Sequence, residues 1–213
     1  FLIDDLLRRC TFPPAGTAVS CAVSGGPDSM ALMLLAHAHG LIVTAIHVDH
    51  GLRTESASDI DVIDPVAESL GITVIVHTVQ VEHGPNLEAR ARAARYGVMP
   101  DDVMTGHTAD DQAETVLINL LRGAGAQGLG AMRPGVSRPL LALRRSDTHA
   151  VCAAAGIATV TDSTNTDPKF QRNRVRNELL PLMTEISLRD PVPLLVRSAD
   201  VLRDDNDLLE ELA

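Results

Sequence analysis

The sequence has few cysteines and almost no lysine. Its three cysteines, Cys10, Cys21 and Cys152, are an odd number at wide spacings, and no two of them form a C-x-x-C pair. This pattern disfavours a zinc site, an iron–sulfur site and a disulfide framework, and it fits a reducing cytoplasm. Lys169 is the single lysine, which indicates a GC-rich genome and says nothing about function.

Long apolar runs are absent as well. Runs such as residues 31–36 are far too short to cross a bilayer, and no signal-peptide pattern is visible. The formal net charge of −10 argues against a nonspecific nucleic-acid coat. With 213 residues, of which 45% are hydrophobic, the chain can bury a real core in one large domain, or in one domain and part of a second. We therefore expect a cytoplasmic globular protein with no membrane segment.

Two basic clusters stand out from the acidic background. Solvated helix faces explain most such clusters, so neither one identifies nucleic-acid binding by itself. The first cluster holds Arg133, Arg138, Arg144 and Arg145, and the second holds Lys169, Arg172, Arg174 and Arg176.

Strand-like and helix-like segments alternate along the chain. Residues 41–48 form a continuous apolar run, as expected of a parallel strand covered on both faces. Repeated β-α units with short joints predict a doubly wound, mostly parallel five-stranded sheet, followed by C-terminal helices. The predicted strands are residues 17–23, 41–48, 72–79, 102–105 and 157–160.

The sequence SGGPDS, residues 24–29, follows the first predicted strand and leads into a helical pattern. A strand, a glycine-rich turn and a helix place backbone N–H groups where they bind an anion. Gly25 and Gly26 allow positive φ and close approach of a ligand, and Asp28 or Ser29 can cap the helix. No lysine follows the glycines, so this is not the ATPase loop GxxxxGK[ST]. The alternative is a flexible turn with ordinary capping, but the position between two apolar elements favours phosphate binding.

Two further polar segments follow predicted strands. The first is HVDHGLR, residues 47–53, in which Asp49 can bind a ribose hydroxyl or a metal and Arg53 can bind a phosphate. The alternative is a polar loop at the end of a strand that binds no ligand. In GHTADDQAET, residues 106–115, the acids at 110, 111 and 114 share one helix face behind a possible Thr108 cap.

Acids near a helix N-terminus are stabilised by its dipole, by ~0.3–1 kcal/mol each, which is a sufficient structural explanation for the second segment. The functional alternative is a cluster that binds Mg²⁺ or orients a cationic substrate, with His107 as a base or donor. Because all three polar segments follow strands, where parallel sheets place ligands, the functional alternative is favoured.

SGGPDS resembles the SGGxDS signature of the PP-loop ATP pyrophosphatases, which split ATP between the α and β phosphates and adenylate a carbonyl oxygen. Over nearly the whole chain, the succession of motifs resembles the tRNA(Ile)-lysidine synthetases. The resemblance implies that ATP activates C2 of the wobble cytidine of tRNA(Ile) with a CAU anticodon, and that free L-lysine displaces AMP to give lysidine. The motifs are SGGPDS, HVDHGLR, ARAARY, GHTADDQAET, LLRGAG, RPLL, DSTN and RNRVRNELLPLM.

The resemblance also implies roles for the matched residues. It implies catalytic roles for Asp28, His107, Asp111 and Glu114, with Asp28 and Asp111 holding Mg²⁺. ATP would be bound by Ser24, Gly25, Gly26, Asp28 and Ser29, and bordered by Ala22, Val23, His47, Val48, Asp49 and Gly106. The tRNA or substrate contacts would be Arg53, Arg92, Arg95, Arg138, Arg172, Asn173, Arg174 and Arg176.

The resemblance also implies cofactors, partners and domains. The implied cofactors are ATP and Mg²⁺, and the implied partners are tRNA(Ile) and lysine. A homodimer is possible, but the sequence does not decide the oligomeric state. Residues 1–186 would form the catalytic domain, and residues 187–213 a helical connector to a missing C-terminal region.

Three other functions are compatible with the glycine-rich turn. A tRNA thiolase typically needs catalytic or cluster-binding cysteines, and these three have no suitable spacing. An NAD synthetase would share SGGxDS but not GHTADDQAET followed by RNRVRNELLP. A non-catalytic ATP-binding module typically carries a different glycine motif after a later strand. An assay of pyrophosphate release separates these three functions from that of a lysidine synthetase, for which the release should require both lysine and tRNA.

Overall fold

The computed structural model describes residues 2–49, 56–79, 97–160 and 167–212, together with Arg90 and Ala94. The chain divides into two compact units. The first unit consists of Phe1–Gly106 and Gly135–Val160, and the second of His107–Pro134 and Thr161–Ala213.

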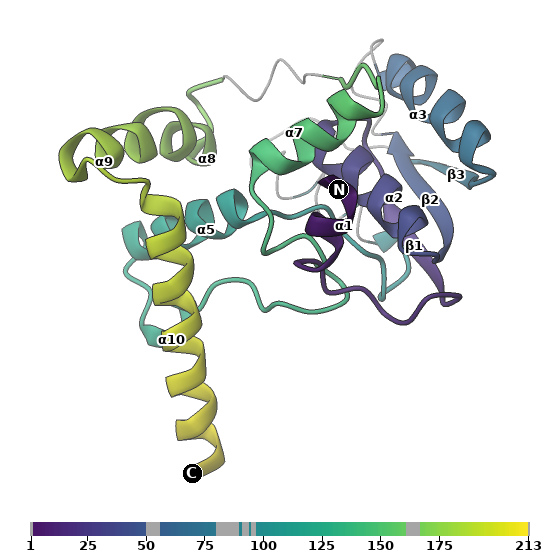
Figure 1. Ribbon diagram of the computed structural model, residues 1–213. Coiled ribbons are helices and arrows are strands. Elements are labelled where there is room, and N and C mark those ends of the chain that lie inside the picture. The colour runs from purple at the N-terminus through teal and green to yellow at the C-terminus, as the bar shows by residue number, and fades with distance from the viewer. Residues whose placement is uncertain are drawn as a thin grey trace. The chain divides into compact units, whose positions relative to one another are not determined.

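A parallel sheet forms the centre of the first unit (Figure 1). Its strands are β1 (Ala18–Ala22), β2 (Ile42–Asp49) and β3 (Thr73–Thr78), in the order β1-β2-β3. Thr44 of β2 pairs with Ser20 of β1 on one side and with Thr73 of β3 on the other. The first three predicted strands and their parallel arrangement are therefore confirmed.

Beyond β1, the sheet continues as a single parallel bridge between Cys21 and Met104. The Met104 N–H donates to the Ser20 carbonyl at 2.8 Å, and the Ala22 N–H donates to the Met104 carbonyl at 2.9 Å. The predicted fourth strand is thus reduced to one bridge. The predicted fifth strand over residues 157–160 is wrong, because the Val160 N–H donates to the carbonyl of Gly25 in the turn rather than to a sheet ladder.

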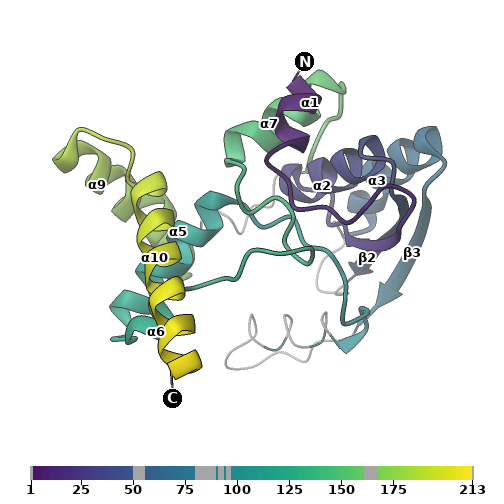
Figure 2. The same cartoon turned by 60° about the horizontal axis from the view of Figure 1, so that its bottom comes forward.

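The order in which the chain adds strands reverses at β1. β2 and β3 are added on one side of β1, whereas Met104 lies on the other. Right-handed crossovers then place α2 (Pro27–Ala38) and α3 (Ser56–Leu70) on the same face of the sheet, and Figure 2 shows both on one side of β2 and β3. Parallel α/β sheets bind ligands at such a switch, beyond the carboxyl ends of the strands. The carboxyl end of β1 leads directly into residues 24–29.

Both faces of the sheet are covered by other parts of the chain. Alternate residues of β2 point to opposite faces, and they belong to two different hydrophobic clusters. Val43 and Ala45 belong to the main hydrophobic cluster of the unit. Ile46 packs on the other face in a smaller cluster, against Met99 and Val103. This two-sided burial explains why the sequence of β2 is a continuous apolar run.

Helix α2 is the most deeply buried helix described in the first unit. Residues 30–33, 35 and 36 are completely buried, because α2 has the sheet on one side and α1 (Leu2–Leu7) and α7 (Arg145–Ala154) on the others. A helix covered nearly all round needs no polar stripe, so its sequence is apolar rather than amphipathic. The start of α2 is therefore held in place by packing along its length.

The second unit is helical. It contains α5 (Ala109–Leu121), α6 (Ala126–Leu129), α8 (Gln171–Arg174), the π-helix η2 (Val175–Leu179), α9 (Leu180–Ser187) and α10 (Pro191–Leu212). α10 packs on α5 and α6 (Figure 1). The buried Arg203 of α10 donates to the carbonyls of Gly130 at 2.6 Å and Met132 at 2.8 Å. The domain boundary expected at residue 186 stays a prediction. Among the described residues, no helix is both long and apolar enough to cross a bilayer.

Gly106, two residues after the Met104 bridge, lies directly against the first turn of α2. A Cβ atom at Gly106 would come within 2.5 Å of the Asp28 carbonyl oxygen and 3.1 Å of the Ser29 nitrogen. Both neighbours are backbone atoms, which cannot rotate away as a side chain would. Only glycine therefore allows the chain after Met104 to pass the start of α2.

We predict that Gly106→Ala lowers the free energy of unfolding by about 1–3 kcal/mol, because the new methyl group forces the two backbones apart. Urea denaturation measures this loss. The control is Gly97→Ala, since no atom lies within 4 Å of a Cβ at that position. If Gly106→Ala is as stable as the control, the close approach does not constrain the fold.

Candidate functional site

Residues 24–29 form a closed turn between β1 and α2. Gly25 has φ +76°, in the left-handed region that favours glycine. The Ser24 N–H donates to the Ser29 hydroxyl at 3.0 Å, and that hydroxyl donates to the Gly26 carbonyl at 2.9 Å. These bonds fix the turn at the N-terminus of α2, where the first N–H groups have no acceptor within the helix. The arrangement is suited to binding an anion.

Among the residues that the structure describes, nothing requires glycine at position 26. Gly26 has φ −73° and ψ 158°, an extended conformation that any residue can adopt. The nearest atoms to a Cβ there would be the Ser24 hydroxyl oxygen at 3.7 Å and the Val160 carbonyl oxygen at 4.0 Å, which are ordinary contacts. A glycine that neither backbone strain nor a close contact requires fits the close approach of a ligand to the backbone, and the turn therefore fits the phosphates of a nucleotide.

His47, at the carboxyl half of β2, lies beside the strand that leads into the turn. Its ring is buried, and Nδ1 lies 2.9 Å from the Val23 carbonyl oxygen. Because a carbonyl can only accept, Nδ1 carries the donated proton. The other ring nitrogen, Nε2, is buried and has no hydrogen-bond partner within the described part of the chain. Buried polar atoms of this kind normally bond to a ligand or a water, which fits the expectation that the ends of β1 and β2 border the adenosine.

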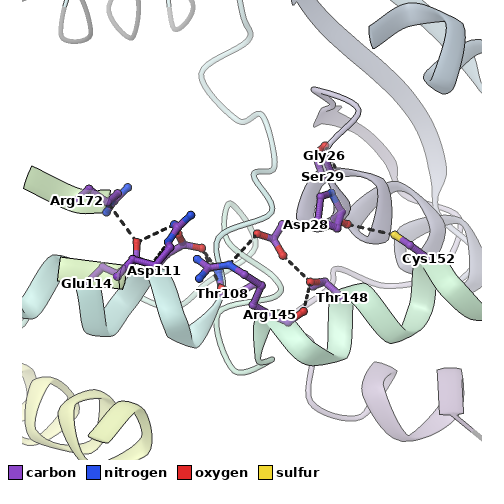
Figure 3. Close-up of polar contacts among 12 residues, drawn as sticks. Gly26, Asp28, Ser29, Thr108, Asp111, Glu114, Arg145, Thr148, Cys152 and Arg172 are labelled. Atoms are coloured by element: carbon purple, nitrogen blue, oxygen red, sulfur yellow. Dashed lines mark hydrogen bonds and ion pairs between the residues drawn. The ribbon is translucent and has the colours of Figure 1, made fainter. Parts of the chain in front are cut away.

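Asp28, in the first turn of α2, contacts α7. The Thr148 hydroxyl lies 2.5 Å from Asp28 Oδ1, and Arg145 Nε lies 3.7 Å from Asp28 Oδ2 (Figure 3). Thr148 belongs to no recognised motif. The sequence signal that could have identified it is the helical spacing that it shares with Arg145 and the buried Cys152.

The acidic segment 106–115 forms the start of α5, in the second unit. Thr108 is the N-cap, and both its N–H and its hydroxyl lie 2.9 Å from Asp111 Oδ2. Asp111 therefore satisfies the N-terminus of its own helix, a role that stabilises a helix by about 1 kcal/mol. His107 directly precedes this cap.

Glu114, one turn further along α5, is completely buried and is bound by arginines. Arg176 donates to both of its oxygens, from Nε at 2.6 Å and from Nη2 at 3.0 Å. Arg172 Nε lies 3.4 Å from Oε2, and Arg176 also lies 3.6 Å from Asp111 (Figure 3). A buried carboxylate is stable only when it is paired, so the arginines supply the charge that Glu114 needs. The structure thus joins Asp111, Glu114, Arg172 and Arg176 into one network.

The remaining residues expected at the tRNA lie in different surroundings. Asn173 is buried and donates to the Asp167 carbonyl at 2.9 Å. Arg174 is exposed and forms an ion pair with Glu178, whose pKa its hydrogen bond lowers. Arg138 lies in the first unit, in a turn closed on the Gly135 carbonyl. Arg53, Arg92 and Arg95 lie outside the described residues.

The three cysteines are protonated thiols. Burial raises the pKa of Cys10 and Cys21 to about 12, and burial together with the charge of Asp28 raises the pKa of Cys152 to about 11. In the part of the chain that the structure describes, no three His, Cys, Asp or Glu side chains form a group that could hold a metal ion. A magnesium ion bound to nucleotide phosphates needs only one or two protein carboxylates, so Asp28 fits such an ion.

Comparison with known proteins identifies the family. Residues 5–183 match the PP-loop domain. The tRNA(Ile)-lysidine synthase of Mycolicibacterium paratuberculosis is 44% identical over 200 residues, covering 90% of this chain and 62% of that protein. The enzyme of the same name from Mycobacterium leprae is 43% identical over 225 residues, covering 97% of this chain and 69% of that protein. The chain therefore belongs to the PP-loop family and, among its members, to the tRNA(Ile)-lysidine synthases, which confirms the resemblance of the motifs.

A solved structure agrees at the level of the fold. The U34-tRNA thiolase NcsA from Methanococcus maripaludis, with its [4Fe-4S] cluster, superposes with a TM-score of 0.75. The match covers 95% of this chain and 80% of that chain, at 16% identity. Identity this low supports a common fold and nothing about the reaction. The chain spans 62% of the length of the first relative above, so the activity of the whole protein is a matter for proposal.

We predict that Glu114→Gln lowers the free energy of unfolding by about 1–3 kcal/mol, because a neutral amide replaces a fully buried carboxylate that pairs with two partly buried arginines. The control is Glu178→Gln, whose exposed pair with Arg174 is of the kind that contributes about 1 kcal/mol or less. Urea denaturation at neutral pH compares the two. Equal stabilities for the two variants would contradict the structural role of Glu114.

Proposed function

We propose that the whole protein uses ATP to attach free L-lysine to C2 of the wobble cytidine of tRNA(Ile) with a CAU anticodon, forming lysidine and releasing AMP and pyrophosphate. The observation that carries the proposal is the closed turn of residues 24–29 at the N-terminus of α2, in a chain 43–44% identical to proteins named tRNA(Ile)-lysidine synthase. The turn supports ATP as the activating substrate, and the family supports lysine and tRNA.

In this proposal, the first unit holds the nucleotide. Backbone N–H groups at the start of α2 and in the turn would bind the phosphates, with Ser24 and Ser29 keeping the turn closed. Asp28 would bind Mg²⁺, which neutralises charge on the departing pyrophosphate. Bound ATP supplies the adenylate that makes the C2 oxygen a good leaving group.

The acids of α5 would serve the lysine substrate. Its ε-amine must lose a proton before it attacks, so Asp111 or His107 is the proposed acceptor, and Asp111 is the proposed contact for the ammonium before that step. Glu114 has both oxygens engaged by Arg176, which supports an indirect role: it fixes the two arginines near Asp111. Of the basic cluster formed by Lys169, Arg172, Arg174 and Arg176, Arg174 is the exposed arginine, and it is therefore the proposed contact for a phosphate of the tRNA.

A thiolation reaction is less well supported. A catalytic cysteine attacks as the thiolate, not as the thiol. With pKa values of about 11 to 12, the three cysteines hold their protons at neutral pH. These side chains therefore favour the ligase over the thiolase.

The whole protein, incubated with ATP, labelled lysine and a CAU-anticodon tRNA transcript, tests the proposal. We expect label in the tRNA, one pyrophosphate for each lysine incorporated, and no product when ATP, lysine or tRNA is left out. Nucleotide binding without pyrophosphate formation would instead indicate a non-catalytic module. Pyrophosphate formation that does not depend on lysine would indicate another PP-loop ligase.

We predict that Gly26→Val weakens the binding of Mg–ATP by about tenfold or more, because its side chain fills the space that a phosphate must enter. The variant should still fold, since a Cβ at this position meets only ordinary contacts among the described residues and the loss of a glycine N-cap costs about 1 kcal/mol. Isothermal titration calorimetry and urea denaturation measure the two effects. Retained affinity in a folded variant would remove the turn from the nucleotide site.

A further inference from the structure

One face of α7 lies against the start of α2. Arg145, Thr148 and Cys152 have the spacing i, i+3 and i+7, which places them on a single stripe of the helix. The Cys152 thiol lies 3.4 Å from the Pro27 carbonyl, and the other two side chains contact Asp28 (Figure 3). The stripe therefore touches the phosphate-binding turn at two successive residues.

Thr148 is the completely buried member of this stripe. Valine would fill nearly the same volume without a polar atom that needs a partner, so packing alone does not require a hydroxyl group here. The hydroxyl has one proton and two acceptors within reach, the Arg145 carbonyl oxygen at 2.8 Å and Asp28 Oδ1 at 2.5 Å. A carboxylate is the stronger acceptor because its charge assists the bond, so the proton is donated to Asp28.

Arg145 contacts the second oxygen of the same carboxylate, with Nε 3.7 Å from Oδ2. Two side chains from one rigid helix thus hold the two oxygens of Asp28. About a quarter of each side chain of the Asp28–Arg145 pair is exposed, at 27% and 23%, so the carboxylate is both held and accessible. A supported, accessible carboxylate is the arrangement expected of a preorganised ligand.

We propose that Thr148 is a positioning residue: its hydroxyl holds the Asp28 carboxylate in the orientation that receives the magnesium ion of Mg–ATP. This inference rests on the proposed use of ATP at residues 24–29. Without the hydroxyl, Asp28 can change rotamer, and binding of the metal–nucleotide complex must first restore its orientation. Loss of the hydroxyl should therefore weaken the binding of ATP in the presence of Mg²⁺ and leave the binding of metal-free ATP unchanged.

The test measures the Kd of ATP by isothermal titration calorimetry, with Mg²⁺ and with EDTA, and without tRNA or lysine. We expect Thr148→Val to weaken binding about tenfold with Mg²⁺ and to leave binding in EDTA unchanged. Thr148→Ser keeps the hydroxyl and should restore wild-type affinity. The control for the chemical change alone is Thr184→Val in the second unit, because the exposed Thr184 hydroxyl bonds the Leu180 carbonyl of its own helix.

A double-mutant cycle separates positioning from a general structural effect. In the Asp28→Asn background, Thr148→Val should cause no further loss of magnesium-dependent affinity. If Thr148→Val does not fold, Thr148→Ala takes its place, since it removes the hydroxyl without adding volume.

Three results would overturn the inference: wild-type affinity without the hydroxyl, an equal loss in Thr148→Ser, or a loss that persists in the Asp28→Asn background. A wild-type protein that binds no Mg–ATP would instead overturn the proposed function, and the inference with it.

Discussion

The approach of Gly106 to the backbone of Asp28 is the constraint on which the first unit depends. One of the segments that meet there follows β1, and the other follows the parallel bridge of Met104 beside β1. Because a Cβ would lie only 2.5 Å from the Asp28 carbonyl oxygen, the segments can pass at this distance only if one of them carries no side chain. That contact brings the switch in strand order and the turn of residues 24–29 to the same place. The geometry suited to phosphate binding follows from this packing.

Charged side chains in both units are held by partners from distant parts of the chain. In the first unit, α7 supports Asp28 from a helix whose own sequence carries no binding motif. In the second unit, Arg176 and Arg172 balance Glu114, which is completely buried. In each case, a carboxylate in the first turns of a helix is fixed by side chains of another helix. Such support keeps a charged group in one orientation, which is what binding a metal ion or an ammonium group requires.

Family membership and geometry contribute different parts of the functional argument. The PP-loop match and the identities of 43–44% define the family and make lysine and tRNA the proposed substrates. The structure supplies what a motif cannot: the unstrained backbone of Gly26, the engagement of Glu114 by arginines, and the raised pKa values of the three thiols. Of these features, only the raised pKa values of the thiols bear on the choice between the proposed ligase and a thiolase.

The sequence alone determined the elements that local patterns encode. Apolar runs predicted β1 to β3, SGGPDS predicted the turn, and a possible Thr108 cap predicted the start of α5. Tertiary structure decided the pairings. Arg176 and Glu114 are 62 residues apart, and Thr148 and Asp28 are 120 apart. It also reduced the fourth strand to one bridge and turned Val160 toward the Gly25 carbonyl instead of a sheet. Local spacing fixes which face a residue occupies, whereas the partner that meets that face depends on how distant segments pack.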